Sequence, residues 1–125
     1  MTLKLLKPAD FACRHTGENR MDPAFLERLD RLFERFGKLP RITSGYRSPT
    51  HPSEASKPHP GAHTLGLAAD IATPTGADAF TLVRLALDLG FSGIGIKGTG
   101  PSRFIHLDCA PSRPEAPRPT LWTYP

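Results

Sequence analysis

Two short apolar runs, each with an ionisable residue near its centre, constrain the fold of this chain most strongly. Asp70 lies within the apolar residues 67–72, and His106 lies within the run Phe-Ile-His-Leu-Asp at 104–108. Both runs are typical of buried β-strands. A carboxylate or an imidazole on a buried strand is costly to desolvate unless a partner compensates it. The fold must therefore bring a compensating group to each of them, and a metal ion is one such group.

A third candidate ligand, His63, precedes Asp70 by one short loop. His63, Asp70 and His106 together offer two imidazoles and one carboxylate, which is the ligand set of a catalytic zinc ion with a fourth position for water. Gly66 lets the chain turn sharply between the first two, so that a loop histidine and a strand aspartate can reach one ion. The alternative is a buried carboxylate–imidazole pair with an unrelated surface histidine.

Residues 22–37 carry the clearest helical signal. Asp22 is a favourable N-cap, Pro23 suits the first turn, and Gly37 supplies a stop. Apolar residues at helical spacing predict one buried stripe: Leu26, Leu29, Leu32, Phe33 and Phe36.

A second helix is predicted from about Ala77 to Leu89, ending at Gly90. Its inner face is expected to consist of Phe80, Val83, Ala86 and Leu87, broadened by Leu82, Leu85 and Leu89. Four short strands are predicted, at residues 41–44, 67–72, 92–97 and 103–108. Short strands without regular βαβ alternation favour one α+β domain over residues 1–125, with a small, mainly antiparallel sheet and two principal helices.

Alternation along the last strand places Phe104, His106 and Asp108 on one face of the sheet. The proline-rich stretch 49–61 is expected to be a loop, and its two histidines, His51 and His59, to be solvated. The last dozen residues are expected to form an extended tail. Its Trp122 and Tyr124 either stack on a sugar or peptide, or pin the tail to the core.

Residues 93–98 match the Gly-x-Gly-x-x-Gly pattern of dinucleotide-binding folds. In those folds the glycines follow a strand and open a helix. Here they lie inside a predicted strand that runs into Thr-Gly-Pro, so we interpret the match as accidental.

Composition excludes several functional classes. The net charge of +4 comes from scattered Lys and Arg without a dense run, which argues against nucleic-acid binding. No apolar run is long enough to span a membrane, and the N-terminus lacks the features of a signal peptide, so we expect synthesis in the cytoplasm. The two cysteines, Cys13 and Cys109, are expected to be reduced thiols, with one disulfide between them as the alternative.

Three ordered motifs resemble the zinc D-Ala-D-Ala carboxypeptidases: Ser44-Gly-Tyr-Arg47-Ser-Pro, His63 followed by Gly66 and Asp70, and Phe-Ile-His106-Leu-Asp. That superfamily also contains vancomycin-resistance dipeptidases, phage endolysin endopeptidases and the Hedgehog signalling domain. The resemblance covers residues 11–124 and is closest to short, single-domain bacterial and phage members. It implies a Hedgehog-like peptidase fold and one Zn²⁺ per chain, held by the same three candidate ligands.

The resemblance also implies a substrate-binding role for Arg47, whose guanidinium stays charged and can grip a carboxylate with two hydrogen bonds. Ser44 and Tyr46 would lie near the site. Two departures stand out: many relatives have serine at the position of Gly61, and several have an acidic general base at the position of Arg103. Asp108 is the nearest substitute. It would act either as the base or as an acceptor that holds an imidazole N–H.

These expectations predict a zinc-dependent peptidase that hydrolyses an amide bond in peptidoglycan peptides, of carboxypeptidase or endopeptidase type, by attack of metal-activated water. The chain would be a monomer, with Arg47 and Asp108 as catalytic residues. Without a signal peptide, a phage lysis or tail-associated protein, or a cytoplasmic recycling enzyme, would fit. The alternative is a non-catalytic zinc domain that binds cell wall or a protein partner, as Hedgehog-type relatives suggest.

Overall fold

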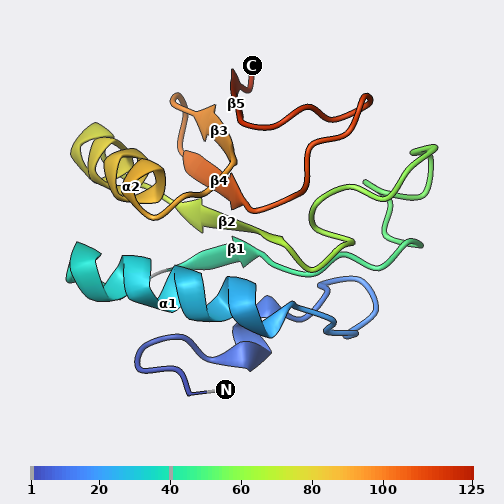
Figure 1. Ribbon diagram of the computed structural model, residues 1–125, viewed down its shortest axis with the longest axis horizontal. Helices are drawn as coiled ribbons and strands as arrows, with labels where there is room; N and C mark the ends of the chain where they lie inside the picture. Colours follow the sequence, from blue (N-terminus) through green and yellow to red (C-terminus); the bar gives the residue numbers. More distant parts are fainter. Residues whose placement is uncertain (1, 40) are drawn as a thin grey trace.

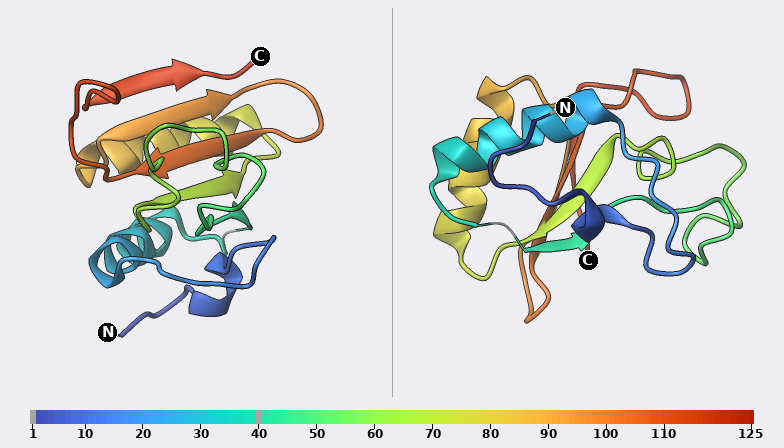
Figure 2. Two further views of the ribbon diagram at one scale, coloured as in Figure 1. Left: turned by 90° about the vertical axis from the view of Figure 1, so that its right-hand side faces the viewer. Right: turned by 90° about the horizontal axis from the view of Figure 1, so that it is seen from below.

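A five-stranded sheet forms the centre of the molecule, with both helices on one of its faces (Figures 1 and 2). The computed structural model describes residues 2–39 and 41–125. The elements in chain order are η1 (Pro8–Phe11), α1 (Pro23–Phe36), β1 (Ile42–Ser44), β2 (Ala68–Ala72), α2 (Gly76–Asp88), β3 (Gly93–Lys97), β4 (Phe104–Asp108) and β5 (Thr120–Thr123). This arrangement confirms the α+β class.

The strand order is β1-β2-β4-β3-β5. The pairs β1–β2, β2–β4 and β3–β4 are antiparallel, whereas β3 and β5 run parallel. All four strands predicted from the sequence are present, each shorter than expected by one residue at its start. The tail is different: it was expected to be merely extended, but residues 120–123 form β5 at the sheet edge.

The helix α1 has the termini that the sequence predicts. The Asp22 side chain accepts a hydrogen bond from the Phe25 amide at 2.9 Å, and Gly37 adopts the left-handed conformation with φ of 77°. Its apolar stripe belongs to the same hydrophobic core as residues of β2, β3, β4 and α2. The buried stripe residues are Phe25, Leu26, Leu29, Leu32 and Phe33.

The inner face of α2 agrees with the prediction only in part. Phe80 and Leu87 are exposed by 71% and 62% of their surface. The buried residues are Leu82, Leu85 and Ala86, all of which the sequence places on or beside the inner face. The sequence of this helix has apolar residues on more than one side. Which side is buried is decided by packing against α1 and the sheet.

The two faces of β4 have different roles. Ile105 and Leu107 belong to the hydrophobic core between sheet and helices. Phe104, His106 and Asp108 point to the opposite face, as alternation predicts. Figure 2 shows the loops of residues 45–66 in front of that second face. The fold therefore places the candidate site between the sheet and these loops.

Both cysteines, Cys13 and Cys109, are free thiols, in agreement with the favoured prediction. Within the described part of the chain, no helix has both the length and the apolar character needed to cross a membrane.

A buried carboxylate ties the N-terminal segment to α1. Asp30 is only 6% exposed and accepts hydrogen bonds from the backbone amides of Lys4, Leu5 and Leu6 at 2.8–2.9 Å. Burial by itself raises the pKa of this carboxyl. The three amide donors and the nearby Lys4 charge outweigh it and hold the pKa below its ordinary value.

We therefore expect Asp30→Asn to lower the free energy of unfolding by about 1–3 kcal/mol at neutral pH, because the anion and one acceptor are lost. A carboxyl with a lowered folded-state pKa stabilises the fold above its unfolded pKa of about 3.9, and this contribution disappears as pH falls below it. Urea unfolding of both proteins from pH 7 to pH 2.5 should show the two curves converging at acid pH. A constant gap over this range would contradict the prediction. Asp88→Asn, at an exposed position on α2, is the matched control.

Candidate metal centre

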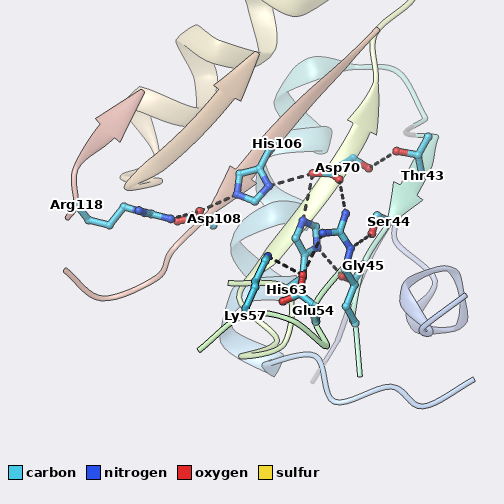
Figure 3. Close-up of polar contacts among 11 residues, drawn as sticks. Thr43, Ser44, Gly45, Glu54, Lys57, His63, Asp70, His106, Asp108 and Arg118 are labelled. Atoms are coloured by element: carbon cyan, nitrogen blue, oxygen red, sulfur yellow. Dashed lines mark hydrogen bonds and ion pairs between the residues drawn. The ribbon is translucent and has the colours of Figure 1, made fainter. Parts of the chain in front are cut away.

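Three ligand side chains from separate segments meet on the loop-covered face of the sheet (Figure 3). Asp70 and His106 lie directly opposite each other on β2 and β4. His63 reaches the same point from the turn that precedes β2. One donor atom from each residue lies within 4.8 Å of the other two, and all three residues are buried. Both the grouping and the pairing of Asp70 with His106 on adjacent strands agree with the sequence.

The far nitrogen of each imidazole is held by a group that can only accept a hydrogen bond. His63 Nδ1 lies 2.7 Å from the Gly45 carbonyl oxygen, and His106 Nε2 lies 2.7 Å from Asp108 Oδ2. Each of these nitrogens must therefore carry a hydrogen. The lone pairs of His63 Nε2 and His106 Nδ1 then remain free on the inner side of the site. Metal-binding histidines are oriented in this way, through a hydrogen bond on the other ring nitrogen.

Both free nitrogens face the same carboxylate oxygen. Asp70 Oδ1 lies 3.3 Å from His63 Nε2 and 3.0 Å from His106 Nδ1. Three electron-pair donors gathered this closely in a buried place repel one another unless a cation lies among them. Imidazole and carboxylate donors suit a zinc-type divalent ion. The residues present therefore fit a metal ion.

The ionisation of the cluster reflects the same crowding. Burial raises the pKa of Asp70, but its contacts with the ring nitrogens of His106 and His63 outweigh burial and hold the pKa well below the ordinary value. Burial lowers the pKa of His106, yet the carboxylates of Asp108 and Asp70 on its two nitrogens raise it overall. The site thus favours positive charge on the His106 imidazole whenever no other cation supplies it.

Arg47 contacts the ligand set from the loop after β1. Its Nη2 lies 3.3 Å from Asp70 Oδ2, and its Nε donates to Ser44 Oγ at 3.1 Å. Its Nη1 lies 3.5 Å from Glu54, a carboxylate with only 3% of its side chain exposed. Glu54 also accepts from Lys57 Nζ at 2.8 Å. Sequence reasoning missed Glu54, because nothing in the proline-rich loop marks it as buried.

Asp108 is completely buried behind His106. Its Oδ1 accepts from Arg118 Nε and from the Ala110 amide, at 3.0 and 3.1 Å. Its Oδ2 accepts from Arg118 Nη2 and is bonded to His106 Nε2, both at 2.7 Å. Burial raises its pKa, but the bonds to His106 and Arg118 outweigh it and keep the pKa well below the ordinary value. Arg118 was not singled out from the sequence.

A cavity of about 460 Å³ opens beside the cluster. All three candidate ligands and Arg47 line it, as do the aromatic residues Phe104, Trp122 and Tyr124. The ring centroids of Trp122 and His106 are 5.0 Å apart. The tail therefore lines the cavity and is also held against the sheet. Its aromatic residues are placed both to stack on a bound sugar or peptide and to pin the tail to the core.

Other predicted residues lie at or behind this cavity. Ser44 supports Arg47 from behind, and Tyr46 is 4% exposed; neither lines the cavity. His59 is exposed at the cavity rim. His51 is half-buried with its ring 5.9 Å from that of His15.

The two departures from the resembling enzymes have structural correlates. A Cβ atom placed on Gly61 would lie 2.9 Å from Glu54 Oε1, so Glu54 occupies the direction in which a serine side chain would project. Arg103 extends toward the start of α2, where a Cβ placed on Gly76 would lie 3.4 Å from its Nη2. Arg103 does not line the cavity.

Comparison with known proteins gives one family. A family model described as Peptidase M15 matches residues 4–108, more than four fifths of the chain. The match includes all three candidate ligands and Arg47, and it ends at Asp108, before Arg118 and Trp122. It agrees with the resemblance indicated by the motifs. No curated protein matches the chain.

Proposed function

This chain belongs to the peptidase M15 family, and we propose that it is a zinc-dependent hydrolase of an amide bond in bacterial cell-wall peptides. The family supports peptidase activity, and the His63, Asp70 and His106 group fits the metal that such peptidases use.

The observation that carries the proposal is the direction of the donor atoms. His63 and His106 are each held at one ring nitrogen by an acceptor, so that the other nitrogen faces Asp70 at the wall of the cavity. A preformed donor set beside a cavity is what a catalytic metal requires. The bound ion would polarise the amide carbonyl and make water a stronger nucleophile at neutral pH.

Arg47 is suited to bind the substrate. Its guanidinium lines the cavity, is fixed by Ser44 and Glu54, and stays charged at all working pH values. In this position it can hold a substrate carboxylate, or the carbonyl oxygen as negative charge develops on it.

For Asp108 we propose the orienting role. Complete burial and engagement of both oxygens separate this carboxylate from the cavity, which a general base must reach. Its bond to His106 Nε2 instead fixes the ring orientation.

The direct test is mass spectrometry of purified muropeptides after incubation with the zinc-loaded protein. We expect cleavage of one amide bond, visible as a defined mass loss, and complete inhibition after removal of the metal with a chelator. Readdition of zinc should restore the activity. Products that persist in the chelated sample would contradict a metal-dependent hydrolase.

A second candidate is a non-catalytic zinc domain that binds cell wall or a protein. The seclusion of Asp108, together with Arg103 in place of an acid, is the observation that favours it. A zinc-loaded protein that is inert on a broad muropeptide panel, yet sediments with cell-wall sacculi, would support this candidate over the first.

A further inference from the structure

We propose that Arg118 and Trp122, called here the C-terminal clamp, position the His106 imidazole for the metal. This inference rests on the metal centre of the proposed function. Both residues lie beyond the end of the family match at residue 108, on the segment that leads into and forms β5. They act on the ring from two sides, one at its edge and one at its face.

At the edge, Arg118 acts through Asp108. Two parallel bonds of 3.0 and 2.7 Å join the guanidinium to the two carboxylate oxygens, and Oδ2 is bonded in turn to His106 Nε2. Asp108 has no exposed surface, so without Arg118 its negative charge would lose its main compensation. The carboxylate would then no longer be held in place, and the hydrogen bond that orients His106 would weaken.

At the face, Trp122 closes off the ring. Its centroid lies 5.0 Å from that of His106, with the planes inclined at 51°. The Arg118 guanidinium carbon lies 5.3 Å from the centre of the Trp122 ring, a distance typical of a cation–π contact. The two clamp residues therefore support each other as well as His106.

The neighbouring strand β3 leaves room for the clamp. In the sheet register, Gly93 lies opposite Asp108 and Gly95 lies opposite His106. A Cβ atom on Gly93 would overlap the Asp108 carboxylate, and one on Gly95 would lie 2.6 Å from Trp122 Nε1. Glycine within a strand often marks the close approach of another group. These two glycines thus form the space into which Asp108 and Trp122 fit.

The test is zinc affinity, measured by competition with a chromophoric chelator, together with the visible spectrum of the Co²⁺-substituted protein. Loss of a group that orients a metal ligand typically weakens metal binding about 10–100-fold. We expect this loss for Arg118→Gln, a smaller loss for Trp122→Leu, and an altered Co²⁺ spectrum in both. Arg118→Lys should recover part of the affinity, because one charged contact to Asp108 remains possible.

Two control variants separate positioning from general damage. Arg113→Gln removes another arginine of the same tail, one that pairs with Glu115 at 3.6 Å instead of Asp108. Leu121→Ala alters an exposed neighbour of Trp122 on β5. Both should bind zinc as the parent does. A purely structural role for the clamp would lower the unfolding temperature of the metal-free protein without changing the zinc affinity of the folded one.

The outcomes distinguish this inference from the function on which it rests. If the parent protein binds zinc tightly and Arg118→Gln and Trp122→Leu bind it equally well, the positioning role of the clamp is contradicted and the proposed metal centre is supported. If the parent itself binds no zinc, both are wrong. Should Arg118→Gln fail to fold, Trp122→Leu provides the same comparison.

Discussion

Asp70→Ala should abolish both metal binding and peptidase activity. Asp70 supplies the donor toward which both imidazoles point, and it also holds Arg47 at 3.3 Å. Without it, two neutral nitrogens are left to hold a divalent ion. Metal that binds only the folded state stabilises it by about 2.7 kcal/mol at a concentration 100-fold above the dissociation constant. We expect this zinc-dependent increment in unfolding free energy to be present in the parent and absent in the variant.

The measurement is metal content after dialysis, combined with thermal unfolding in zinc and in chelator. Asp30→Asn is the matched control: Asp30 is another buried aspartate, but it accepts hydrogen bonds from backbone amides of the N-terminal segment and is not one of the candidate ligands. That variant should be less stable in both conditions and still gain the full increment from zinc. Retention of zinc at full stoichiometry by Asp70→Ala would overturn the ligand assignment.

Gly66→Ala should destabilise the protein strongly. Gly66 has φ of 74°, and a Cβ atom there would overlap the Arg20 carbonyl oxygen. The left-handed conformation costs an alanine roughly 1–2 kcal/mol, and the overlap adds about 1–3 kcal/mol more. The Gly66 carbonyl also accepts the Asp22 amide at 2.9 Å, at the start of α1. We therefore expect a loss of about 3 kcal/mol or more, together with weaker zinc binding, because the turn carries His63.

Gly100→Ala separates the two causes. Gly100 has nearly the same backbone angle, with φ of 81°, but a Cβ atom there would meet nothing within 4 Å. Urea unfolding of this variant should show only the conformational cost of roughly 1–2 kcal/mol. Equal losses in the two variants would mean that the approach of Arg20 to Gly66 is unimportant for stability.

Local signals were sufficient to predict most of the fold. The capping residues of α1 and the short apolar runs of β1 to β4 identify these elements to within a residue or two, because each signal lies in the element itself. Two features could not be found in this way. β5 depends on pairing with β3, a contact between distant segments, and the proline-rich tail has no strand pattern of its own.

The orientation of α2 shows the same limitation. Phe80 and Leu87 have the spacing of buried residues, yet they face outward because α1 and the sheet cover another side of the helix. A helix with apolar residues on more than one side does not specify by itself which side is buried.

The candidate site likewise contains residues that local motifs identify and residues that only the folded chain brings into place. His63, Asp70, His106 and Arg47 could be proposed from motifs, and the structure brings all four to one cavity. Their supporting groups could not. Glu54 lies in an irregular loop and Arg118 in the tail, and only the folded chain brings them to Arg47 and Asp108. Gly93 and Gly95 of β3 have a role unrelated to the nucleotide-binding pattern that they match. They leave room for side chains of β4 and β5, which lie beside them only in the folded chain.

The pairing of Asp70 with His106 across β2 and β4 has a consequence for how the chain folds. A slip of one residue between antiparallel strands moves every side chain of one strand to the opposite face. In such a misaligned pairing Asp70 would turn toward the apolar layer, and the ligands would no longer converge. An ion bound by these three ligands during refolding would therefore favour the native alignment over its nearest competitor. The rate at which cobalt absorbance develops in a stopped-flow refolding experiment would then report the rate at which β2 and β4 align.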